Sequence, residues 1–93
     1  MKCEDHLKVD KFFWSEQYPE VHKWIDSSFA QHQGYLHWTI NHHKEAIKDK
    51  YGEYTIQYNV AYMHILSDWL SHYQIACVPE NKQEVIDYLE SLK

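Results

Sequence analysis

The chain has little of what usually cross-links or punctuates a protein: its 93 residues include two cysteines, two glycines and two prolines. The cysteines, Cys3 and Cys77, lack the Cys-x-x-Cys spacing of a zinc knuckle or a redox motif. They could pair and join the two ends of the domain, but two free thiols in a reducing compartment are the favoured interpretation. The sequence therefore excludes a disulfide-rich scaffold.

Long apolar runs and clusters of positive charge are also missing. No stretch approaches the ~18 apolar residues of a membrane-spanning helix, and the first residues lack the apolar segment of a secretory signal. The net charge is −5 with neutral histidines, and no Lys/Arg cluster is present to neutralise phosphates. We therefore expect a cytoplasmic protein that binds neither membrane nor nucleic acid directly. An acidic surface suits a protein partner, although the same charge also describes an ordinary soluble surface.

The few glycines and prolines divide the chain into segments of helical length. Apolar residues recur at helical spacing in each segment. The predicted helices cover about 3–14, 18–33, 35–51, 54–72 and the residues after 79. Pro19 suits a first helical turn, and Gly34 and Gly52 suit positions just past a helix end. Residues 54–58 alternate and could form a strand, but they have no evident partner strand. The fold prediction is a single all-α domain over residues 1–93, a compact bundle of four to five short helices.

Histidine is abundant, with eight copies spread along the whole chain. Imidazole is the commonest protein ligand of zinc. Two histidines stand four residues before an aspartate, His22 before Asp26 and His64 before Asp68, and this spacing places both side chains on one face of a helix. The aspartate in such a pair can bind the same metal or orient the histidine.

Four of the predicted helices each place one histidine at the edge of the stripe that faces the core, and bundles build metal sites from such converging side chains. We therefore predict a metal site, with zinc first and iron or manganese less favoured. The candidate ligands are His6, His22, His42, His64, Asp26 and Asp68. For any single histidine the alternative is an ordinary residue at the boundary of the core. For the whole set this alternative is less favourable, because each histidine would have to be buried or solvated separately, at a cost in free energy. Strong metal motifs such as His-Glu-x-x-His are absent.

The order of these residues resembles a small family of bacterial and phage proteins that carries no assigned activity. The matching elements are Asp5-His6, His22-x-Trp24-Ile25-Asp26-Ser27-Ser28, His37-x4-His42, Ala46-Ile47, Tyr51-Gly52 and His64-Ile65-x-x-Asp68. The resemblance covers about residues 5–79. It supports the predicted metal site, but it does not imply a reaction. Leu36 and Trp38 stand where the family has arginines, so an anion-binding role of those arginines does not carry over. Retention of His37 and His42 fits a metal kept for structure.

Two classes of function follow. The first is a small zinc-binding interaction module, a monomer or small homo-oligomer whose acidic, tyrosine- and tryptophan-bearing surface binds another protein. Its size, charge and resemblance suggest a phage-encoded inhibitor of a host defence complex such as CRISPR-Cas, acting in the host cytoplasm. The second is a metal-dependent hydrolase of a phosphoester or nucleotide, with an open metal position for water. Few basic or glycine-rich elements are present to hold a phosphate, so binding is favoured over catalysis.

Overall fold

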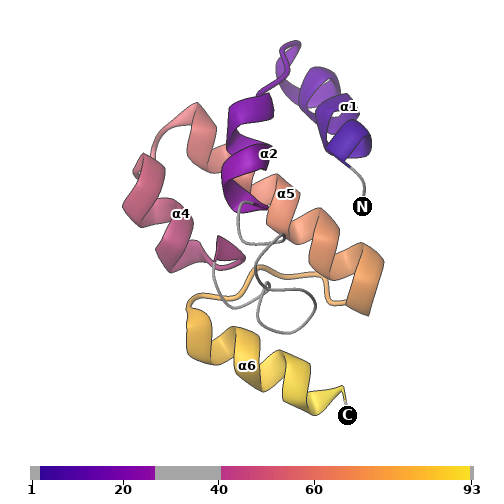
Figure 1. Cartoon of the computed structure of the whole chain (residues 1–93), viewed down its shortest axis with the longest axis vertical. Coiled ribbons are helices and arrows are strands. Elements are labelled where there is room, and N and C mark those ends of the chain that lie inside the picture. The colour runs from indigo at the N-terminus through magenta and orange to yellow at the C-terminus, as the bar shows by residue number, and fades with distance from the viewer. Residues whose placement is uncertain (1–2, 27–40, 93) are drawn as a thin grey trace.

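Five α-helices make up the described part of the chain in a computed structural model, which describes residues 3–26 and 41–92 (Figure 1). The helices are α1 (Cys3–Trp14), α2 (Pro19–Ile25), α4 (Lys44–Tyr51), α5 (Ile56–Tyr73) and α6 (Lys82–Ser91). These residues contain no strand. The prediction of an all-α bundle of four to five helices is therefore confirmed.

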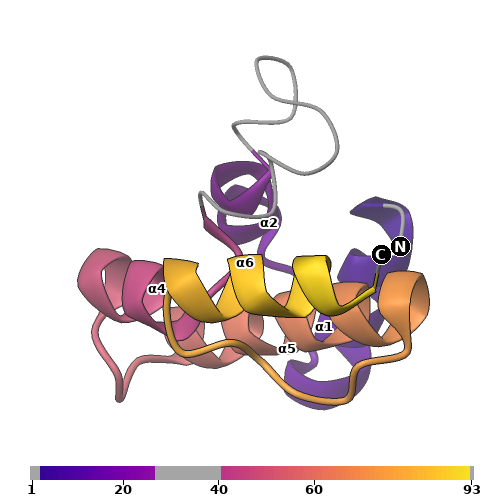
Figure 2. The ribbon, with the colours of Figure 1, turned by 90° about the horizontal axis from the view of Figure 1, so that it is seen from below.

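The hydrophobic core is built around α5. This helix contributes four fully buried apolar side chains, and α2, α4 and α6 pack theirs against it. The buried apolar residues are Val21, Ile25, Ile47, Val60, Ala61, Ile65, Trp69, Val78, Val85 and Leu89. Figure 1 shows α5 crossing the middle of the molecule, with α6 beyond its lower side, and in Figure 2 α2 rises above the level of α4, α5 and α6. The radius of gyration, 12.5 Å, matches the value of about 12 Å expected for a compact chain of this length.

Two helix starts follow from polar caps that the sequence carries. Thr55 caps α5 and Asn81 caps α6, and each side chain accepts the backbone N–H of the third residue after it. Such side chains prefer this position because they satisfy an N–H that the first helical turn leaves unpaired. Tyr54 therefore lies in the turn before α5, Thr55 caps the helix, and residues 56–58 form its first turn, so the alternative of a strand is excluded.

The second predicted helix is longer than the observed one. The pattern extends it to about residue 33, whereas α2 ends at Ile25 and Asp26 occupies the C-cap, where its backbone N–H donates to the carbonyl of His22. This hydrogen bond closes the last helical turn, and the side chains of His22 and Asp26 both contact His64, so the two residues point to the same side as the spacing predicts. Residues 27–33 of that prediction lie outside the described part of the chain.

The third predicted helix is interrupted before α4. His43 has an extended backbone (φ −149°, ψ 161°) and caps α4, with its Nδ1 accepting the backbone N–H of Ala46 at 3.2 Å. The continuous helix expected over 35–51 is therefore wrong at His42 and His43, and its residues 35–40 lie outside the described ranges. Histidine is not among the preferred N-cap residues, so this break has no familiar sequence signal.

Helix α1 is attached differently from the other helices. None of its described side chains belongs to the buried hydrophobic core, and its two buried side chains are polar: His6 is 2% exposed and Asp10 is 1% exposed. Phe12 and Phe13 are largely exposed, and only Trp14, at the helix end, packs part of its ring against the core. Polar contacts therefore provide most of the described attachment of α1.

The predictions on thiols and membranes can be compared with the described residues. Cys77 is exposed and has a free thiol, as predicted. The side chain of Cys3 lies outside the described part. Within residues 3–26 and 41–92, no helix is long and apolar enough to span a membrane.

Candidate metal centre

Seven histidine and aspartate side chains gather where α1, α2 and α5 meet. This His–Asp cluster consists of His6, Asp10, His22, Asp26, His42, His64 and Asp68. Asp26 has a side chain that is 40% exposed, and the other six residues are at most 5% exposed. Burial of so many ionisable groups is unfavourable unless they pair with one another or hold a cation. The cluster is therefore the strongest candidate for a functional site in the described chain.

All six residues that the sequence nominates as metal ligands belong to the His–Asp cluster. The structure brings their side chains together, and metal binding by each of them stays a prediction. Of the other histidines, His43 is buried and caps α4, and His72 is exposed on α5. His32 and His37 lie outside the described residues.

Helix α5 positions the pair at the centre of the cluster. His64 and Asp68 are one turn apart, and Nε2 of His64 lies 3.0 Å from Oδ2 of Asp68. The four-residue spacing predicts this contact, because side chains four apart on a helix point to the same side. Both residues face away from water because α5 is the helix on which the others pack.

His42 reaches the cluster from a non-helical bend, and neighbouring groups hold its backbone. The side-chain amide of Asn41 donates to the carbonyl of Trp24 at 2.9 Å, which ties the bend to the end of α2. The indole N–H of Trp69 donates to the carbonyl of His42 at 3.5 Å, which ties the bend to α5. The bend therefore places the His42 ring next to the end of α2 and to α5.

Four of these side chains face one another with the dimensions of a tetrahedral metal site. We call them the tetrad: Asp26, His42, His64 and Asp68, whose ligand atoms all lie within 4.8 Å of one another. Nε2 of His42 lies 3.6 Å from Asp26 Oδ1 and 3.4 Å from Asp68 Oδ2. Nε2 of His64 lies 3.5 Å and 3.0 Å from the same two oxygens. Ligands placed tetrahedrally at about 2.0–2.1 Å from a metal such as zinc are separated by about 3.3 Å, and these four distances are close to that value, so the tetrad could hold a metal ion.

The charges of the tetrad favour a cation at its centre. Burial opposes ionisation of Asp68, but contacts with His42, His6 and His64 prevail and hold its pKa far below the usual carboxyl value. Burial lowers the pKa of His64, but Asp26 and Asp68 prevail and raise it above its ordinary value. The field that raises this pKa stabilises positive charge at Nε2 of His64, whether a proton or a metal ion carries that charge.

Nε2 of His64 is buried without a hydrogen bond to any described residue. It lies 3.0 Å from an oxygen of Asp68 and 3.5 Å from an oxygen of Asp26. A buried polar nitrogen without a hydrogen bond is costly. A buried ring nitrogen beside two carboxylates could bind a metal ion.

Three further side chains surround the tetrad and contact its members. Nε2 of His6 lies 3.0 Å from Oδ1 of Asp68, the oxygen opposite the one that faces the tetrad. Nδ1 of His22 lies 2.7 Å from Nδ1 of His64, and Nε2 of His22 lies 2.6 Å from Oδ2 of Asp10. Burial lowers the pKa of His22, and the hydrogen bond to Asp10 only partly opposes this effect. Through these contacts His6 orients the carboxylate of Asp68, and His22, held by Asp10, orients the ring of His64.

Asp10 is the member of the cluster that the sequence prediction missed. Its Oδ2 accepts the backbone N–H of Tyr18 at 3.0 Å in addition to the contact with His22, so it joins α1 to the start of α2. The missed signal was present: Asp10 follows His6 by four residues, the spacing already noted for His64 and Asp68. A third His-x-x-x-Asp pair would have identified it.

His6, His22 and His64 form a second close group, with nitrogens within 4.8 Å of one another. The rings of His6 and His64 are stacked, with centroids 3.6 Å apart and planes at 14°, whereas His22 meets His64 edge to edge through the 2.7 Å contact between their Nδ1 atoms. The lone pair of an imidazole nitrogen lies in the ring plane, so stacked rings direct their lone pairs past one another. The rings of His42 and His64 meet at 63°. The tetrad is therefore the better metal site.

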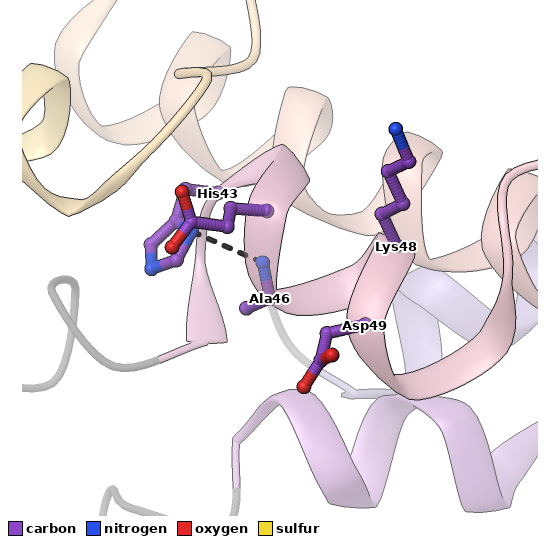
Figure 3. Close-up of a pocket in the computed structure, with 5 residues that line it drawn as sticks. His43, Ala46, Lys48 and Asp49 are labelled. Atoms are coloured by element: carbon purple, nitrogen blue, oxygen red, sulfur yellow. Dashed lines mark hydrogen bonds between the residues drawn. The ribbon is translucent and has the colours of Figure 1, made fainter.

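A separate hollow opens at the start of α4 (Figure 3). It has a volume of about 610 Å³ and is lined by His43, Glu45, Ala46, Lys48 and Asp49. None of these residues belongs to the His–Asp cluster, and Nδ1 of His43 is engaged with the N–H of Ala46 (Figure 3). The hollow is therefore not a substrate pocket over the tetrad.

Comparison of the chain with protein-family models, curated proteins and solved structures finds no match. The resemblance to a bacterial and phage family thus stays a prediction from the sequence. The His–Asp cluster is therefore the feature of the described chain from which a function can be proposed.

Proposed function

We propose that this chain is a small helical protein stabilised by one zinc ion, which the tetrad binds. The observation that carries the proposal is the buried Nε2 of His64, which faces Asp26 and Asp68 at ligand–ligand distances and makes no hydrogen bond with a described residue. Two imidazole nitrogens and two carboxylate oxygens at tetrahedral spacing suit zinc. Iron and manganese are less favoured because they usually take more ligands than the tetrad offers.

The proposed role of the metal is structural. Asp26 follows α2, His42 precedes α4, and the other two ligands come from α5. One ion would therefore join three segments that are distant in the sequence. A domain of about this length has a limited core, and the free energy of metal binding to the folded state adds to its stability.

The proposed biological role is that of an interaction module that binds a protein partner. The small size of the chain and its net charge of −5 support this role. A phage-encoded inhibitor of a host defence complex, with CRISPR-Cas as one example, is the narrower form of the proposal. In either form the metal holds the scaffold, and the partner contacts residues outside the His–Asp cluster.

A metal-dependent hydrolase is the second candidate, and the exposure of Asp26 is the observation that favours it. This side chain is 40% exposed, so solvent reaches one corner of the tetrad. If water replaced Asp26 on the metal, the site would have the open position that hydrolysis requires. In that case Asp26→Ala would retain zinc, and the wild type would cleave a phosphoester. A structural site predicts that Asp26→Ala weakens zinc binding and that no cleavage occurs.

We expect about one equivalent of zinc to co-purify with the untagged protein, because binding to a preformed buried site is tight. Elemental analysis measures it directly. His42→Ala should lose the metal, whereas His72→Ala, which alters an exposed histidine of α5, should retain it. Less than about a tenth of an equivalent of any transition metal in the wild type would contradict the proposed metal site.

A further inference from the structure

We infer that Asp10 and His22 form a hydrogen-bonded relay that fixes the tautomer of His64, with the proton on Nδ1 and the lone pair of Nε2 directed at the metal. This inference rests on the proposed zinc site. Asp10 and His22 act in it as positioning residues. They determine which nitrogen of His64 is available, and they do not bind the metal themselves.

The first link of the relay is the contact between α1 and α2. Oδ2 of Asp10 lies 2.6 Å from Nε2 of His22 and also accepts the backbone N–H of Tyr18. An ionised carboxylate can only accept hydrogen bonds. The proton of the His22 ring is therefore on Nε2, where it is donated to Asp10. The side chains of His22 and Asp10 are 1% and 2% exposed, so water does not compete for this contact.

The second link is the contact between the two histidines. Nδ1 of His22 lies 2.7 Å from Nδ1 of His64, and a hydrogen bond between two ring nitrogens needs a proton on one of them only. Because neutral His22 carries its proton on Nε2, its Nδ1 is the acceptor. Nδ1 of His64 is therefore the donor, and Nε2 of neutral His64 carries no proton.

The third link is the tetrad itself. A lone pair on Nε2 of His64 faces Oδ1 of Asp26 and Oδ2 of Asp68, at 3.5 Å and 3.0 Å. Three electron-rich atoms at such distances repel one another unless a cation lies between them. Without the relay, the proton of His64 could move to Nε2 and block the metal position. A carboxylate behind a ligating histidine serves the same purpose in other metal sites, and here a second histidine extends the chain by one step.

The spectrum of the zinc-loaded wild type tests the relay without any variant. Long-range ¹H–¹⁵N correlation identifies the protonated ring nitrogen, and a scalar coupling between two nitrogens reports a hydrogen bond that joins them. We expect His64 to carry its proton on Nδ1, to bind zinc through Nε2, and to show a coupling to Nδ1 of His22. Binding of zinc through Nδ1 of His64 would overturn the relay and leave the metal site intact.

Two substitutions of Asp10 test its contribution to zinc affinity, measured by competition with a zinc-binding dye. Asp10→Ala should weaken binding by about 10–100-fold, the usual effect of losing a group that orients a metal ligand. Asp10→Asn should weaken it less, because the amide oxygen can still accept from His22. Asp5→Ala is the matched control, since it removes an aspartate of the same helix that has no place in the relay.

The outcomes separate the two proposals. Failure of the wild type to take up zinc would refute the metal site and the relay together. Normal zinc uptake with equal affinities in Asp10→Ala, Asp10→Asn and the Asp5→Ala control would refute the relay alone. If Asp10→Ala does not fold, the wild-type spectrum and Asp10→Asn still decide the question.

Discussion

Replacing His64 with alanine is expected to abolish zinc binding and to lower the melting temperature by roughly 15–30 °C. A ligand that binds only the folded state at a thousand times its Kd contributes about 4 kcal/mol, and in a domain of this size each kcal/mol corresponds to about 4–8 °C. His64 is chosen because its Nε2 faces both carboxylates of the tetrad, and its Nδ1 contacts His22. Differential scanning calorimetry with and without added zinc measures the shift.

His72→Ala is the matched control for this prediction. It removes an exposed histidine from the same helix, and such surface changes usually alter the free energy of unfolding by less than about 0.5 kcal/mol. A chelator should lower the melting temperature of the wild type and of His72→Ala, and should have little effect on His64→Ala. Equal zinc-dependent shifts in all three proteins would show that His64 is not a ligand.

Removal of zinc is expected to release α1 before the rest of the bundle opens. The buried side chains of this helix are His6 and Asp10, and both contact residues that orient or form the tetrad. Hydrogen bonds to charged groups contribute about 1.5–3 kcal/mol each. Their loss should therefore accelerate amide exchange in α1 by at least about tenfold, as hydrogen–deuterium exchange with and without chelator would show.

Helix α6 is the internal control for this experiment. Val85 and Leu89 attach it to the core through apolar contacts, which do not involve the metal. Its exchange, and that of α5 around Trp69, should change much less than that of α1. The same increase in every helix would mean that the metal stabilises the bundle as one unit, and unchanged exchange in α1 would mean that other contacts hold it.

The helices and the ligand candidates could be predicted because local spacing determines both. Apolar residues three and four apart mark a buried helix face, so α5 and its neighbours were recognisable. The contact between His64 and Asp68 needs only one helical turn. Convergence of histidines from several segments followed from their position at the edges of the apolar stripes.

The bend at His42 and the contacts of His22 could not be predicted, because they depend on tertiary contacts that local spacing does not encode. The bend at His42 exists because His43 caps α4 and because Asn41 and Trp69 hold the backbone around it. The partners of His22 likewise come from two other helices. Spacing pairs His22 with Asp26, but it does not show that His22 contacts Asp10 and His64 while Asp26 faces His42 and His64. The sequence therefore predicts most members of the His–Asp cluster. It does not show which of them form the tetrad and which only contact the tetrad.

Anomalous diffraction at the zinc absorption edge, from crystals of the zinc-loaded protein, shows directly whether the tetrad binds zinc. We expect one peak, about 2.0–2.2 Å from Asp26 Oδ1, His42 Nε2, His64 Nε2 and Asp68 Oδ2. No peak at the tetrad, or a peak within bonding distance of His6 and His22, would contradict the proposed metal site.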